Sequence, residues 1–292
     1  MSEPDDWADQ ALRYPDALRT LEHDAIHTAT LRLIAALETA QRTAANGWTA
    51  ITATARDLPG ADAIRQLITR IRQLLDAAFR GQAAHAQRTA RDAATTAARL
   101  GATQAAATVG TITGTTPPNP PPQTSDTAQQ AADAIPAAVD AEHHAALALL
   151  TTAALTAAGL AALAAVFNRA RRAVSRIAAA VAVAVTSAAA AGSAAVARAL
   201  GPRMLLLWVA EPDACPACAA YAGHTVPVGK KFPGGLSLDP RRTVFATPLY
   251  GPPRHIHCRC VVIPWRSDWQ TTGTPLPQLL RKRARQTARR TA

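Results

Sequence analysis

All four cysteines of this 292-residue chain lie in two close pairs, Cys215 with Cys218 and Cys258 with Cys260, and His255 precedes the second pair. Two cysteines separated by two residues are a common arrangement for thiolates on one Zn²⁺, because the turn between them brings both sulfurs to the same side. In an extended strand residues i and i+2 face the same way, so Cys258 and Cys260 could reach one ion. The spacing predicts a zinc site with Cys215, Cys218, Cys258 and either Cys260 or His255 as ligands.

Two other chemistries are open to the same cysteines. One is a disulfide between Cys215 or Cys218 and Cys258 or Cys260, which would crosslink a chain poor in large apolar side chains. The other is thiol–disulfide redox chemistry, which needs a thioredoxin-like βαβ setting that the sequence does not supply. The acidic start, residues 1–6, lacks the apolar stretch of a secretory signal, so we expect a protein kept in a reducing cytoplasm, where disulfides are rare.

The histidines near the cysteines raise the question of catalysis. His224, His255 and His257 would allow a Cys/His nucleophile, but four clustered cysteines are more typical of metal ligands than of a lone nucleophile. The sequence has no Gly-x-Ser-x-Gly, no His-Glu-x-x-His and no Gly-rich phosphate loop. We therefore predict a protein that is not an enzyme and has no small-molecule substrate.

The residues around the cysteines predict a small module of turns and short strands. Gly201-Pro202 ends the helical region, the segments between the pairs are rich in Pro and Gly, and Val261–Trp265 has the composition of a β-strand. Such a module has too little core to fold alone. Metal or disulfide closure would therefore supply part of its folding free energy.

Alanine dominates the apolar residues before this module. Hydrophobic residues make up 49% of the sequence but aromatic residues only 4%, and the high helix propensity of Ala predicts long helices. Apolar spacing predicts a helix from Tyr14 to Ala45, a short connection over Trp48–Leu58 and a second helix packed against the first, whose pattern fades toward Leu100. The apolar stripe of this second helix comprises Ile64, Leu67, Ile68, Ile71, Leu74, Leu75, Ala78 and Phe79.

Two Ala-rich stretches, between His144 and Arg169 and between Arg176 and Arg198, contain no charged residue. One interpretation is a transmembrane hairpin, since about 20 apolar residues can span a bilayer. Ala, Thr and Ser favour insertion far less than Leu or Phe does. We therefore favour a pair of Ala-rich helices that pack within the protein.

The module resembles the C-terminal domain of phage Mu F-type head morphogenesis proteins, which occur in tailed phages and prophages. The resemblance covers the last third of the chain: a Trp strand, Asp-x-Cys-x-x-Cys, an aromatic residue and a Gly, a Pro-rich loop and His-x-x-Cys-x-Cys before an apolar strand. The family's closing signature usually reads His-Pro-x-Cys-Arg-Cys. His255, Cys258, Arg259 and Cys260 occupy its positions here, and Ile256 replaces the Pro.

The resemblance implies a minor structural component of the phage head, associated with the portal and major capsid proteins. It implies a role in capsid assembly or in the readiness of the packaged DNA. The location would be the virion, at the capsid interior or portal vertex, after synthesis in the host bacterial cytoplasm. A helical region usually precedes the module in this family, in agreement with the helices predicted here.

The C-terminal segment is strongly basic. The chain has 31 Lys and Arg against 20 Asp and Glu, a net charge of +11, and no acidic residue follows Leu280. Such a run is typical of a solvated tail, but in a head protein it could reach packaged DNA and bind it without sequence specificity. The candidate nucleic-acid-binding residues are Arg281, Lys282, Arg283, Arg285, Arg289 and Arg290.

The sequence thus predicts a mainly α protein with a long helical N-terminal body, an Ala-rich helical arm and a small α+β Cys/His-knotted C-terminal module. The predicted ranges are a helical N-terminal domain 1–112, a Pro-rich linker 113–126, the helical arm 127–200, the Cys/His module 201–270 and the basic tail 271–292. A nucleic-acid-binding zinc module and a membrane protein are the alternative functions. The first predicts basic and aromatic residues interleaved around the cysteines.

Overall fold

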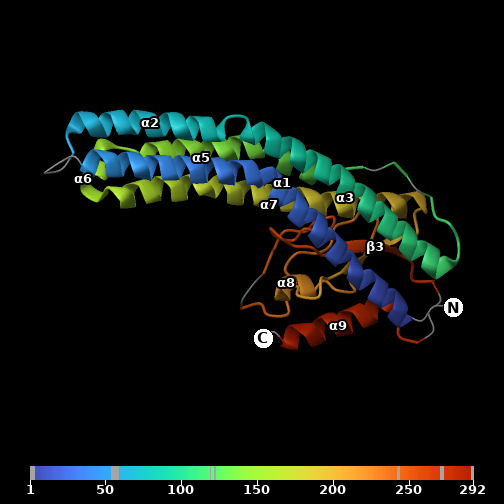
Figure 1. Cartoon of the computed structure of the whole chain (residues 1–292). Helices are drawn as coiled ribbons and strands as arrows, with labels where there is room; N and C mark the ends of the chain where they lie inside the picture. Colours follow the sequence, from blue (N-terminus) through green and yellow to red (C-terminus); the bar gives the residue numbers. More distant parts are fainter. Residues whose placement is uncertain are drawn as a thin grey trace. The chain divides into compact units, whose positions relative to one another are not determined.

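The computed structural model describes residues 4–53, 59–118, 120–121, 123–241, 244–269 and 273–290, without the side chains of Pro4, Arg289 and Arg290. Long helices and one small three-stranded sheet (Figure 1) confirm the predicted mainly α fold with a small α+β C-terminal region. The helices are α1 (Pro4–Ala53), α2 (Ala61–Phe79), α3 (Gln82–Thr113), α4 (Asp126–Asp133), α5 (Ile135–Leu149), α6 (Thr152–Ala158), α7 (Leu160–Ala199), α8 (Pro216–Ala219) and α9 (Leu276–Arg290). The strands are β1 (Leu205–Val209), β2 (Thr225–Pro227) and β3 (Val261–Trp265).

The chain divides into two compact units, each built from segments distant in the sequence. Unit 1 comprises Met1–Ala25, Ala90–Ala131 and Val181–Ala292, and unit 2 comprises Ile26–Thr89 and Ala132–Ala180. Helices α1, α3 and α7 each contribute residues to both units. The consecutive domain ranges derived from the sequence stay a prediction.

In unit 2, helix α2 buries seven of the eight residues of the predicted apolar stripe, and Leu74 is half-buried. A Cβ on Gly47 of α1 would lie 2.8 Å from Leu67 Cδ1, so α2 packs closely against α1, as predicted. Figure 1 shows α1, α2, α5 and α7 running side by side in this unit. The buried residues of α2 are Ile64, Leu67, Ile68, Ile71, Leu75, Ala78 and Phe79.

Helix α1 is longer than the sequence predicts. It begins at Pro4 instead of Tyr14, and it continues past Trp48, so the prediction of a connection starting there is wrong. The buried Trp48 ring packs directly on Gly159, where a Cβ would lie only 2.9 Å from the ring. This contact anchors the last turns of the helix. Residues 54–58 of the predicted connection lie outside the described residues.

The Ala-rich region forms more helices than the predicted pair. Thr151 begins α6 by accepting a hydrogen bond from the Ala154 N–H at 3.1 Å, and Gly159, with a φ of +50°, ends it. Among the described residues, α7 alone is long and apolar enough to cross a membrane by length and composition. Most of its apolar window is buried inside the protein, and core helices meet the same criterion.

In unit 1, glycines allow α3 and α7 to touch backbone to backbone. A Cβ on Gly101 would lie 2.0 Å from the Ala189 carbonyl oxygen, and a Cβ on Gly192 would lie 1.9 Å from that of Ala98. Real side chains do not tolerate such distances. Glycine is therefore required at both crossing positions by close approach alone.

The sheet of unit 1 is antiparallel with the strand order β2-β1-β3, and β3 confirms the predicted exit strand. Trp208 of the central strand is fully buried, and its ring centroid lies 5.1 Å from those of both Tyr221 and Phe232. The buried Ser193 hydroxyl of α7 donates to the Val262 carbonyl at 2.6 Å. Helix α7 is thereby fixed to the edge strand that follows the second cysteine pair.

We predict that Gly101→Ala destabilises the protein by about 1–3 kcal/mol, because the added methyl forces α3 and α7 apart. Gly110→Ala in the same helix is the matched control, since its Cβ would meet nothing closer than 3.5 Å. The control should be neutral or stabilising by up to about 1 kcal/mol through helix propensity. Thermal unfolding followed by circular dichroism measures both, and equal melting temperatures for the two variants would contradict the close crossing.

Candidate metal centre

The pairing of β1 with β3 brings the two cysteine pairs to one end of the sheet. Val209, the last residue of β1, pairs with Val261, the first residue of β3. The chain that leaves β1 soon reaches Cys215, and Cys260 directly precedes β3. The antiparallel register therefore places the first pair beside the second, although 40 residues separate Cys218 from Cys258 in the sequence.

A single helical turn orients the first pair. Cys215 is the N-cap of α8, and its Sγ accepts a hydrogen bond from the Cys218 N–H at 3.5 Å. Pro216 follows at the first helical position, where its fixed φ suits the helix start and its missing N–H costs nothing. The Cys-Pro-x-Cys sequence is thus a local device that turns both thiols toward the same side.

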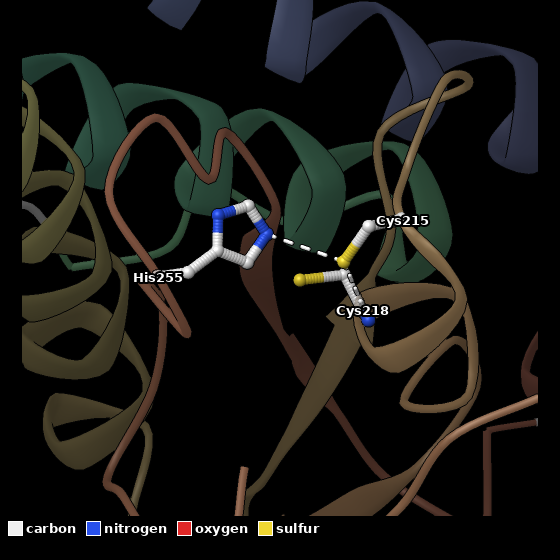
Figure 2. Close-up of side chains that lie close together, drawn as sticks. All are labelled: Cys215, Cys218 and His255. Carbon is white, nitrogen blue, oxygen red and sulfur yellow. Dashed lines mark hydrogen bonds between the residues drawn. The ribbon is translucent and has the colours of Figure 1, made fainter. Parts of the chain in front are cut away.

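His255 directs one ring nitrogen at the first pair, as Figure 2 shows. Its Nε2 lies 3.3 Å from Cys215 Sγ, and its Nδ1 donates to the Ile256 carbonyl at 2.7 Å. A proton fixed on Nδ1 leaves the Nε2 lone pair free for a metal once the ring is neutral. Loss of the Nε2 proton therefore leaves the neutral tautomer that a metal ligand needs.

The observed separations fit tetrahedral coordination. With metal–sulfur bonds of about 2.3 Å and metal–nitrogen bonds of about 2.0 Å, tetrahedral ligands lie about 3.8 Å apart for two sulfurs and about 3.5 Å for sulfur and nitrogen. Cys218 Sγ and Cys258 Sγ are 3.6 Å apart, close to this value and far beyond a disulfide bond. All four cysteines are free.

The five predicted ligands form two groups of three that share Cys218. Cys215, Cys218 and His255 place their ligand atoms within 4.8 Å of one another, and so do Cys218, Cys258 and Cys260. The cluster could hold a metal ion, and either group needs one ligand from the other for four-coordination. The choice of the fourth ligand therefore stays open between His255 and Cys260, as it is in the sequence.

Hydrogen bonds within the cluster favour thiolates at two positions. The Cys218 thiol, helped by His255, lowers the pKa of Cys215 to about 4, and the Cys215 thiolate raises the pKa of His255 to about 9. Burial raises the pKa of Cys258, but hydrogen bonds from Cys218 and Cys260 outweigh it and hold that pKa well below its usual range. A metal would replace the remaining protons, so its affinity must fall as the pH is lowered.

Arg254, just before the candidate ligands, is buried and organises the loop around them. Its guanidinium donates to the carbonyls of Phe245 and Thr247 and lies 5.0 Å from the centroid of the Tyr221 ring. Its backbone hydrogen-bonds to Cys258 and helps to lower the pKa of that thiol. The position of Arg254 beside the cysteines was visible in the sequence, but its burial was not.

The other two nearby histidines do not join the cluster in the described structure. His257 Nδ1 lies 3.1 Å from the Glu22 carboxylate of α1. The centroid of the His224 ring lies 6.3 Å from that of the Tyr221 ring. Spacing alone could not separate His255 from His257, because both lie near the second pair. Their hydrogen-bond partners make the distinction.

The basic segment forms helix α9 over Leu276–Arg290, with Leu276 and Leu280 buried. Of the four predicted nucleic-acid-binding cations whose side chains the structure describes, two have partners. Arg281 donates to the Gly223 carbonyl at 3.1 Å, and Arg283 pairs with Asp5 and Asp9 of α1. Lys282 and Arg285 are exposed. The side chains of Arg289 and Arg290 lie outside the described residues.

No protein-family model, curated protein or solved structure matches the chain. The fold and the site together define a mainly helical protein with a small module built on a Cys/His cluster that could hold a metal ion. The likeness to Mu F-type proteins rests on the motif in the sequence.

We predict that His255→Ala lowers the metal content of the purified, reduced protein, because it removes a ligand atom from the cluster. His224→Ala is the matched control, because this histidine belongs to the same module and its ring lies beside that of Tyr221. It should keep the metal content of the unaltered chain. Elemental analysis of the three proteins measures the difference, and a control that lost metal as fully as His255→Ala would mean that the ligand assignment is wrong.

Proposed function

We propose that this chain is a minor structural protein of a tailed-phage or prophage head, and that its C-terminal module is stabilised by Zn²⁺. The observation that carries the proposal is the convergence of His255, Cys258 and Cys260, the motif residues that resemble the Mu F-type signature, on Cys218 and Cys215. Its partners would be the portal and major capsid proteins. It would reside in the virion after synthesis in the bacterial cytoplasm.

Zinc is the metal that suits these ligands best. Thiolate and imidazole ligands in tetrahedral reach are typical of structural zinc sites, which are closed to solvent, whereas catalytic sites keep an open position. Cys218, Cys258 and Cys260 have no exposed surface. The elemental analysis described for the histidine variants decides this choice, and about one zinc per chain is the expected result.

A structural role agrees with the rest of the cluster's chemistry. A nucleophilic cysteine needs access to its substrate, whereas three of the four thiols are fully buried. Metal binding to such a site contributes folding free energy to a module that has only three short strands. The support is therefore for a zinc ion that stabilises the fold of the module.

The head assignment predicts that the chain copurifies with DNA-filled particles released from the source strain. Gradient-purified particles are analysed by quantitative mass spectrometry, with the portal protein as the reference for copy number. We expect this chain at a constant ratio to the portal protein and resistant to salt washing. Its recovery only in the soluble cell fraction, from a culture that yields particles, would refute the proposal.

A contact with packaged DNA is proposed for the exposed face of α9. Arg281 and Arg283 have protein partners and are therefore less available to phosphates. Lys282 and Arg285 are exposed, and they are the described residues that carry this proposal. Each phosphate contact changes the slope of log affinity against log salt by about 0.9. The contact would be non-specific and would weaken steeply with salt.

We predict that Lys282→Gln with Arg285→Gln weakens binding to random duplex DNA and makes the salt slope shallower by about 2. Arg70→Gln with Arg72→Gln, two exposed cations of α2, is the charge-matched control and should leave the slope unchanged. Fluorescence anisotropy at several salt concentrations measures both. Equal losses for the two pairs would show an effect of net charge alone, and no salt dependence in the unaltered protein would exclude the contact.

A further inference from the structure

Two carboxylates are buried beside the cluster, Glu22 of α1 at 4% exposure and Glu211 after β1 at 6%. A buried carboxylate is strongly unfavourable unless a cation or hydrogen-bond donors compensate its charge. Both carboxylates meet the same partner, Arg259, the residue between Cys258 and Cys260. The compensation of two buried charges therefore depends on where the second cysteine pair lies.

The contacts of Arg259 fix both its backbone and its side chain. Its backbone N–H donates to Glu211 Oε1 at 3.2 Å, and its Nε donates to Glu211 Oε2 at 3.1 Å. Its Nη1 lies 3.7 Å from Glu22 Oε1. The backbone of Glu211 also hydrogen-bonds to Cys260. Glu211 therefore holds Cys260 through its backbone and the preceding residue, Arg259, through its carboxylate.

Helix α1 contacts the module through a matched pair of charges. Glu22 Oε1 accepts from His257 Nδ1 at 3.1 Å, while Arg19, on the same face of the helix, lies 3.6 Å from the Glu211 carboxylate and 2.8 Å from that of Asp213. Glu22 of the helix thus meets two hydrogen-bond donors next to the second cysteine pair, His257 and Arg259. Arg19 of the helix meets two carboxylates that lie just before the first cysteine pair, Glu211 and Asp213.

We propose that Glu211 and Glu22 are positioning residues of the metal centre, and that Arg259 couples the N-terminal part of α1 to metal binding. This inference rests on the proposed metal-stabilised module. Groups that orient the ligands of a metal typically contribute 10- to 100-fold to its affinity. Reciprocity requires that a bound metal strengthens the contact between α1 and the module by the same factor by which α1 strengthens metal binding.

The affinity of the full-length protein for Zn²⁺ tests the first half of the proposal. Glu211→Gln and Glu22→Gln keep the size of each side chain and remove its charge, so each should weaken Zn²⁺ binding by roughly 10- to 100-fold in competition with a chromophoric chelator. Asp268→Asn is the matched control, because its 55% exposed side chain pairs with Arg266, just beyond the end of β3 that is distant from the cysteines. Its affinity should stay within about 2-fold of the unaltered chain, as expected for a change outside the ligand-orienting groups.

Hydrogen exchange tests the second half of the proposal, the coupling between α1 and metal binding. In the unaltered protein, the backbone amides of residues 16–25 should exchange more slowly with Zn²⁺ bound than after chelation, and Glu22→Gln should reduce this difference. Unaltered exchange in this segment on metal removal would overturn the coupling. Glutamate variants that bind Zn²⁺ as tightly as Asp268→Asn would overturn the positioning role while the metal site stands. An unaltered chain that binds no Zn²⁺ would refute the metal-stabilised module itself.

Discussion

The meeting of the two cysteine segments is the constraint on which the C-terminal module depends. Between Cys218 and Cys258, described residues 219–241 and 244–257 contain the end of α8, the three-residue strand β2 and a bridge between Phe232 and Leu249, and are otherwise irregular. Many of the residues in this stretch are Pro and Gly. Closing such a loop costs conformational entropy that local structure does not offset. Strand pairing between β1 and β3 closes it at one point, and the Cys/His cluster closes it at a second. Because Cys218, Cys258 and Cys260 are also members of the buried core around Trp208, loss of the cluster would open the core as well.

Charge around the cluster is balanced locally, in a chain whose overall charge is strongly positive. Thiolates, with or without a metal, carry negative charge in a buried place, and burial of charge is tolerated only with compensation. Among the described residues, Arg254 is buried beside the cysteines and pairs with carbonyls and an aromatic ring, with no ion pair to a carboxylate. Arg259 has two carboxylate partners instead. The two guanidiniums therefore have different roles: that of Arg254 organises the loop before the second cysteine pair, and that of Arg259 links this pair to Glu211 and to α1.

Features set by local pattern could be predicted from the sequence, and features set by distant contacts could not. The apolar stripe of α2, strand β3 and the gathering of the candidate ligands follow from periodicity, composition and spacing. The continuation of α1 past Trp48 depends on a contact with Gly159, which no local signal announces. The role of Glu22 is hidden for the same reason, since its partner His257 lies 235 residues away in the chain. Helix α9 differs, because Leu276, Leu280 and Ala284 recur at helical spacing and could have indicated an amphipathic helix beneath the run of cations.

The two ends of the described chain both pack on the module, and this limits what the basic helix can offer to a polyanion. Gly223 approaches α9 so closely that a Cβ there would lie 2.0 Å from the Pro277 carbonyl oxygen, and Arg281 donates to the same glycine. Arg283 meanwhile neutralises two aspartates near the start of α1. A phosphate backbone that recruited either arginine would have to break these contacts first. The number of cations in the sequence therefore overstates the charge available for DNA, because part of it already holds α9 against the module and α1.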